Sequence, residues 1–72
     1  MMNITNAKEG TEYTVLEIRT SDDELDAFLF SLGCYSGESI TLVSRQRGNY
    51  VIAIKDGRYS IDPLLAKVII IS

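Results

Sequence analysis

The sequence contains no histidine and no tryptophan, and it has one proline and one cysteine. Without histidine the chain cannot form a Ser-His or Cys-His nucleophile pair, and a single cysteine can neither close an internal disulfide nor complete a Cys/His zinc set. The phosphate-binding pattern G-x-x-x-x-G-K-[ST] and the calcium-binding pattern D-x-[DN]-x-[DN]-G are also missing. We therefore expect a protein that is not an enzyme and holds no cofactor.

Long apolar stretches are missing as well. The longest run, Val68–Ile71, is far too short to cross a bilayer, and the first ten residues lack the basic and apolar regions of a secretory signal. The lone cysteine is in keeping with a reducing compartment. These features predict a cytoplasmic protein that does not insert into the membrane.

The chain lacks an excess of basic residues. Seven Lys and Arg stand against ten Asp and Glu, for a net charge of −3, which disfavours binding to nucleic-acid phosphates or anionic lipids. Four basic residues fall near one another in the second half, and we interpret them as solvated strand surface: Arg45, Arg47, Lys55 and Arg58. We expect no nucleic-acid partner.

What the sequence does contain is short segments of β character. With 72 residues there is room for one domain, residues 1–72. Residues rich in Val, Ile, Thr and Tyr, bounded by turn formers, predict strands at Glu12–Arg19, Ser39–Arg45 and Tyr50–Lys55, the last two joined by a loop containing Gly48 and Asn49.

One segment has helical periodicity. Leu25, Phe28, Leu29 and Leu32 are spaced as one stripe of an α-helix and are expected to face the core. Ser21 and Glu24 have the spacing of a capping box, which places the N-cap of this helix at Ser21.

The residues after this helix predict its end and the turn into the next strand. Gly33 is expected at the position after the C-cap, where a positive φ suits glycine, and Cys34 is then expected to pack back on the last turn. Gly37 fits the third position of a type II turn over residues 35–38.

Asp56-Gly57 is a signal for a two-residue hairpin turn, which would pair Lys55 with Arg58. In that register Ile52, Ile54, Tyr59 and Ile61 share the inward face. Tyr50 also points inward, so too few tyrosines remain outside for an aromatic peptide groove.

The end of the chain predicts barrel closure. Asp62-Pro63 is typical of an N-cap followed by the first residue of a short helix, and "KVIII" is expected to form a last strand, buried on both faces. Pairing of that strand with the first gives a mainly β fold with one α-helix: a small SH3-like five-stranded barrel, with the helix inserted after the first strand.

The carboxylates Asp22, Asp23, Glu24 and Asp26 are the one candidate metal site, because hard cations are held by several oxygen ligands. Their place in the first helical turn is expected on dipole grounds alone, so we interpret them as capping and solvated residues and predict no metal site. Phe30 lies off the apolar stripe, near Asp26, and is a candidate anchor for a partner.

The stretch "FLFSLGCYSGESITLV" resembles the ferrous iron transport protein A family, FeoA, whose pattern is a leucine-rich helix ending in L-G, an apolar residue, P-G and a strand. The ending "LLAKVIII" fits the same frame. The chain departs from it at Asp26, Ala27 and Phe28, where Arg is usual, and at Ser36 and Glu9, where Pro is common.

The resemblance implies a cytosolic SH3-like accessory protein for ferrous iron uptake, which contacts the membrane permease FeoB and its GTPase domain. We expect Asp26, Phe30 and Tyr35 to form the contact surface, with Gly33 and Gly37 as structural turns. The alternative is a metal-binding or metal-sensing domain that uses the four carboxylates. The sequence leaves the oligomeric state open.

Overall fold

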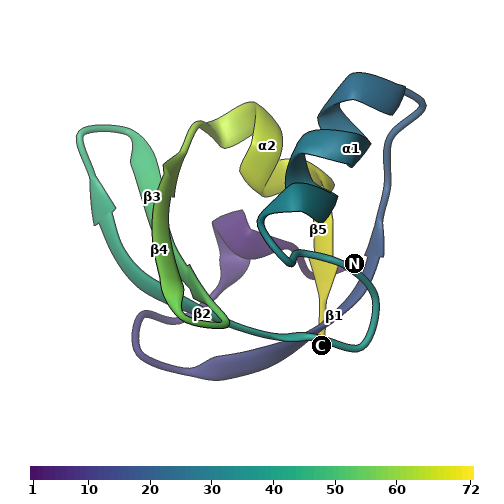
Figure 1. Ribbon diagram of the computed structural model, residues 1–72. Coiled ribbons are helices and arrows are strands. Elements are labelled where there is room, and N and C mark those ends of the chain that lie inside the picture. The colour runs from purple at the N-terminus through teal and green to yellow at the C-terminus, as the bar shows by residue number, and fades with distance from the viewer.

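Five segments of alternating or unbroken apolar character form one antiparallel sheet in the structure, a computed structural model that describes residues 1–72. The strands are β1 (Glu12–Ile18), β2 (Ser39–Gln46), β3 (Asn49–Ile54), β4 (Gly57–Ile61) and β5 (Ile69–Ile71), in the order β4-β3-β2-β1-β5. The helices are α1 (Asp23–Ser31) after β1 and α2 (Pro63–Val68) between β4 and β5, with a short 3₁₀ helix, η1 (Ile4–Asn6), near the N-terminus (Figure 1). The predicted mainly β fold with a helix after the first strand is confirmed.

Two irregularities let the sheet curl. The pairing register shifts between Val15 and Glu17 in β1, and between Leu42 and Ser44 in β2. β-bulges bend a strand and increase its twist. As a result, β1 pairs with β2 along its first half and with β5 along its second half.

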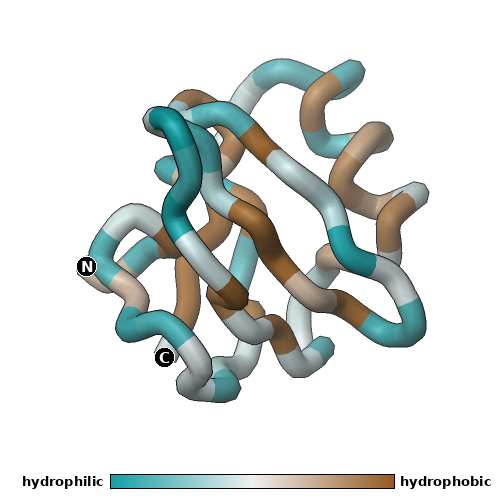
Figure 2. The backbone as a smooth tube through the Cα atoms, turned by 90° about the vertical axis from the view of Figure 1, so that its left-hand side faces the viewer, coloured by the Kyte–Doolittle hydropathy of each residue, from teal (hydrophilic) through white to brown (hydrophobic).

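The core is built mainly of isoleucine. Its fully buried side chains include Ile40, Leu42, Ile52 and Ile54 from the middle of the sheet, with Leu29 from α1. Residues outside this cluster are mostly polar. Figure 2 shows the hairpin turns as hydrophilic segments beside the more hydrophobic strands. None of the helices is long and apolar enough to span a membrane.

Strand β5 is buried along its whole length, as predicted. Ile69, Ile70 and Ile71 are each at most 5% exposed. One edge of β5 pairs with β1, and the other is covered by the N-terminal segment, since Ile71 N–H donates to Met2 O at 2.9 Å and Asn3 bridges to Ile70. Both edges of this apolar strand are therefore hydrogen-bonded within the chain.

The start of α1 differs from the prediction, which placed the N-cap at Ser21. The N-cap is Asp22, whose carboxylate accepts from the N–H groups of Glu24 at 3.0 Å and Leu25 at 3.2 Å. The Thr20 hydroxyl in turn accepts from Asp22 N–H. A carboxylate makes charge-assisted bonds and interacts favourably with the helix dipole, which a serine hydroxyl cannot match.

The predicted apolar stripe of α1 is wrong at Phe28, which is 49% exposed. Leu29 is fully buried, whereas Leu25 and Leu32 are partly buried against the core. A nine-residue helix on a core this small buries one line of side chains, spaced i, i+4 and i+7. Phe28 falls beside that line.

The end of α1 is as predicted. Gly33 has φ +91°, its N–H donates to Phe30 O, and Cys34 N–H donates to Leu29 O, both at 2.9 Å. This pair of bonds is the Schellman motif, which requires a left-handed residue after the C-cap. Gly37 has φ +94° within a turn closed by Glu38 N–H to Tyr35 O, as a type II turn requires at its third position.

The β3–β4 turn lies one residue earlier than predicted, and the loop between β2 and β3, predicted to contain Gly48 and Asn49, is shorter than predicted. Arg47-Gly48 joins β2 to β3, so Asn49 belongs to the strand, and Lys55-Asp56 joins β3 to β4, so Ile54 pairs with Gly57. Lys55 takes the positive φ, +52°, in place of Gly57. The earlier turn shifts the β3–β4 pairing by two residues, so that Ile52 pairs with Tyr59 rather than with Ile61. An even shift leaves the inward face unchanged, and Ile52, Ile54 and Ile61 are buried as predicted.

Gly57 pairs with Ile54 as the first residue of β4, and the Tyr59 ring occupies the space where its side chain would be. A Cβ at Gly57 would lie 2.6 Å from Cζ and 2.8 Å from Cε2 of the Tyr59 ring. An aromatic ring cannot yield as a flexible side chain can. The absence of a side chain at Gly57 is thus a packing requirement.

The last helix begins as predicted, with Asp62 as N-cap accepting from Leu65 N–H at 2.9 Å and Pro63 at the first position. It continues to Val68, so Lys67 and Val68 are helical and β5 is shorter than the predicted "KVIII". Lys67 in the last turn complements the negative end of the helix dipole.

We predict that Gly57→Ala lowers the free energy of unfolding by about 1–3 kcal/mol, because the new Cβ overpacks against the Tyr59 ring. Urea unfolding measures the loss. In a Tyr59→Ala background the same substitution should be nearly neutral. An equal loss in both backgrounds would show that the ring is not the cause.

Candidate functional site: an aromatic pair beside a polar pocket

The surface at the C-terminal end of α1 carries two aromatic rings in contact. Phe30 is 64% exposed, and its ring centroid lies 4.9 Å from that of Tyr35, at an interplanar angle of 34°. We call these two residues the aromatic pair. Both were predicted as contact residues, and the structure brings them together, because the Schellman turn reverses the chain between them.

Lys55 holds the loop that bears Tyr35. Its ammonium lies 2.8 Å from Glu38 Oε1 and 5.4 Å from the centroid of the Tyr35 ring. The Glu38 carboxylate first, and the Tyr35 side chain second, raise the pKa of Lys55 above its usual range. We call this contact of Lys55 with Glu38 and Tyr35 the lysine clamp.

The stem of Lys55 passes over Gly33. A Cβ at Gly33 would lie 2.8 Å from both Cδ and Cε of Lys55. Gly33 therefore has two roles, since it takes the left-handed backbone that ends α1 and leaves room for the lysine. The local sequence predicts the first role but not the second, because Lys55 is distant in the sequence.

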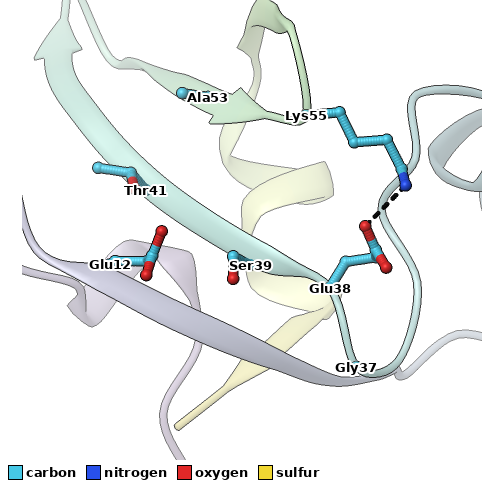
Figure 3. A pocket seen from close by; sticks show the side chains of 7 residues that line it. All are labelled: Glu12, Gly37, Glu38, Ser39, Thr41, Ala53 and Lys55. Atoms are coloured by element: carbon cyan, nitrogen blue, oxygen red, sulfur yellow. Dashed lines mark ion pairs between the residues drawn. The ribbon is translucent and has the colours of Figure 1, made fainter.

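A pocket of about 380 Å³ lies next to the lysine clamp on the outer face of the sheet (Figure 3). We call it the sheet pocket. Its polar lining includes two carboxylates, one ammonium and two hydroxyls, and the seven residues are Glu12, Gly37, Glu38, Ser39, Thr41, Ala53 and Lys55. Nothing in the local sequence pattern predicted it, because its residues come from three strands and two turns.

Asp26, the third predicted contact residue, is exposed on α1. It lies four residues before Phe30, which places both on the same side of the helix. The first turn of α1 is acidic at Asp23, Glu24 and Asp26, and its last turn has no basic residue. This side of the molecule therefore combines exposed apolar rings with negative charge.

The carboxylates at the start of α1 do not form a ligand set. Asp22 is engaged in capping, and no group of three or more acidic or cysteine side chains is placed to hold a metal ion. The reason is geometric, since successive helical residues point in directions about 100° apart.

Cys34 is fully buried, and burial raises the pKa of its thiol from 9.0 to about 12. A nucleophilic or metal-binding cysteine needs a thiolate. In this environment the thiol stays protonated, so Cys34 acts as a small apolar residue of the core, as predicted.

The four neighbouring basic residues Arg45, Arg47, Lys55 and Arg58 do not form a free patch. The Arg45 guanidinium donates to Thr5 O at 3.0 Å and Ala7 O at 2.7 Å, while its backbone N–H donates to Glu9 Oε2 at 2.7 Å. Lys55 is held by Glu38. Two of the four therefore have structural roles, and Glu9, at a position where the FeoA pattern favours proline, anchors β2.

The family model described as the FeoA domain matches residues 2–72. A FeoA protein of Stenotrophomonas maltophilia complexed with zinc, described as a prokaryotic SH3 domain protein, has a TM-score of 0.87 and 17% identity, over 100% of this chain and 91% of that chain. The iron(II) transport protein A of Clostridium thermocellum has a TM-score of 0.89 and 20% identity, over 99% of this chain and 44% of that one.

A manganese-dependent transcriptional repressor shares the fold as well, with a TM-score of 0.86 and 19% identity, over 99% of this chain and 41% of the repressor. No curated protein matches the sequence. The structural matches establish the predicted SH3-like fold.

We predict that Gly33→Ala destabilises the protein by about 1 kcal/mol through its left-handed backbone, and further by displacing Lys55. Gly48→Ala is the matched control, because Gly48 has φ +82° with open space around its Cα. Denaturant unfolding of both variants separates the two effects. Equal losses would mean that the lysine stem moves aside freely.

We also predict that the free energy of unfolding falls as the pH rises above 9. The unfolded thiol of Cys34 ionises near its ordinary pKa, while the folded thiol stays protonated up to about 12. This difference favours unfolding by up to about 1.4 kcal/mol per pH unit. Unfolding curves between pH 8 and 11 should therefore show a steeper decline for the native sequence than for Cys34→Ala; parallel declines would contradict the assignment.

Proposed function

The chain belongs to the FeoA family, and we propose that it serves ferrous iron uptake as a cytoplasmic accessory protein that contacts the GTPase domain of a FeoB-type permease. The family match covers nearly the whole chain and links it to ferrous iron transport. The S. maltophilia relative is described as a candidate activating factor for ferrous iron transport. The contact with the permease is our inference for this chain.

The observation that carries the proposal is the exposed aromatic pair. Phe30 is 64% exposed, so much of its apolar surface is in contact with water. Burying such a side chain in an interface contributes roughly 1.5–3 kcal/mol to the binding free energy. Aromatic side chains are favoured where a few residues supply most of the binding energy.

The aromatic pair is also fixed before any partner arrives. Tyr35 lies between the Schellman turn and the turn closed by Glu38 N–H, and Lys55 contacts its ring. A contact surface ordered in advance loses less conformational entropy on binding. The end of α1 therefore offers a preformed apolar docking site built from two aromatic rings in contact.

We do not advance the metal-binding alternative. The zinc of the S. maltophilia structure and the manganese dependence of the repressor are properties of those proteins. In this chain the acidic residues of α1 are not grouped as ligands, and Cys34 is buried with a raised pKa.

The proposal predicts binding between this protein and the cytosolic GTPase domain of the permease from the same genome. Phe30→Ala should weaken the affinity about tenfold or more, as expected for a residue at the centre of an interface. Isothermal titration calorimetry, run without nucleotide, with GDP and with a GTP analogue, gives the affinity in each state.

Leu16→Ala is the matched control, because Leu16 is 48% exposed and lies on β1 rather than α1. Its affinity should equal that of the native sequence. A GTPase domain that hydrolyses GTP yet shows no association in any nucleotide state would refute the proposal.

A further inference from the structure

The sheet pocket adjoins the aromatic pair at the lysine clamp. Glu38 and Lys55 line the pocket, and Lys55 also contacts the Tyr35 ring. On the side away from the clamp, Glu12 of β1 pairs with Thr41 of β2, which in turn pairs with Ala53 of β3. Figure 3 shows the Glu12 carboxylate on the same side of the sheet as Ser39 and Thr41, with Glu38 turned towards Lys55.

The charges that line the pocket do not balance. Two carboxylates, Glu12 and Glu38, face one ammonium, Lys55. Lys55 is paired with Glu38, and Glu12 forms no ion pair. The pocket therefore has one uncompensated negative charge.

No other cation of the chain supplies the missing charge. Along the same row of the sheet, Arg58 pairs with Ala53 and is the next basic residue. Three strand spacings, about 14 Å along the sheet, separate the backbones of Glu12 and Arg58, and neither residue takes part in an ion pair. Glu17 on the same strand is different, because Arg19 binds it at 3.0 Å.

The pocket also offers acceptors in more than one direction. The carboxylate of Glu12, the second oxygen of Glu38 and the hydroxyls of Ser39 and Thr41 are all outside the hydrogen bonds formed within the chain. Several convergent acceptors with one excess negative charge suit a guanidinium group, which presents five donors in a planar fork.

We propose that the sheet pocket receives a basic side chain, preferably arginine, from a protein segment whose apolar residue rests on the aromatic pair. The segment is complementary in charge to the pocket, where Glu12 is unpaired and the one lining cation, Lys55, is already paired with Glu38. The pocket chemistry stands by itself, while the identity of the segment rests on the proposed function.

Other occupants fit less well. Phosphates of nucleic acids or lipids would be repelled by Glu12 and by a chain of net charge −3. A metal ion would find no group of three acidic side chains there. A protein segment supplies both the cation and the apolar group that the two adjoining features require.

The test uses the small ligand N-acetyl-arginine amide, titrated into ¹⁵N-labelled protein and followed by amide chemical shifts. The isosteric neutral ligand N-acetyl-citrulline amide is the control. We expect saturable shifts at Glu12, Ser39 and Thr41 with the arginine ligand, and at least fivefold weaker binding of citrulline. Equal effects of the two ligands, or no shifts in the pocket up to 50-fold excess, would overturn the proposal.

Glu12→Gln keeps the size of the side chain and removes the uncompensated charge, so it should weaken arginine binding at least fivefold. Glu17→Gln, a carboxylate of the same strand that is paired with Arg19, should leave arginine binding unchanged. Equal loss in both variants would indicate an effect of net charge alone and would contradict a specific pocket.

Phe30→Ala and Glu12→Gln in the calorimetric assay with the GTPase domain separate the two proposals. If Phe30→Ala weakens that complex and Glu12→Gln does not, the proposed function stands, and the proposal that the partner places a basic side chain in the pocket falls. If the GTPase domain fails to bind at all while the pocket still selects arginine over citrulline, the proposed partner falls and the pocket stands.

Discussion

The crossing of Lys55 over Gly33 is the contact on which the proposed docking face of this protein depends. It needs a lysine at a turn position with positive φ and a residue without a side chain at the end of α1. From that crossing the ammonium reaches Glu38 and the Tyr35 ring, which fixes the loop between α1 and β2. The aromatic pair and one wall of the sheet pocket follow from it.

The contact itself is weak in energy, because Lys55 and Glu38 are both open to water and exposed ion pairs contribute little. The contact matters because it positions Glu38 and the Tyr35 ring relative to each other. The stability of the fold comes from the isoleucine core, whereas the clamp selects which conformation of the surface loop is populated. A protein can therefore change this surface in evolution with little effect on the barrel beneath it.

Much of the fold was predictable because its determinants are local. The alternation of β1 to β3, the Asp62-Pro63 start of α2, and the Gly33 and Gly37 turns each depend on a few adjacent residues. The errors arose where two local solutions compete. Ser21 and Asp22 can each cap α1, and either of two neighbouring positions can form the β3–β4 turn, so the local pattern alone does not decide between them. The candidate site was predictable only in part for the same reason: Phe30 and Tyr35 follow from helix geometry, but Lys55 and Glu12 reach the site through strand pairing.

The covering of β5 by Met2 and Asn3 brings the two ends of the chain together. Ile71 N–H donates to Met2 O, and Thr14 and Ser72 exchange hydrogen bonds at 3.1 Å, so both termini leave from one side of the sheet (Figure 1). Domains with neighbouring termini are well suited to insertion into other proteins. The architecture is thus suited to being carried by a longer polypeptide with short connections, in keeping with solved structures of which this chain matches less than half.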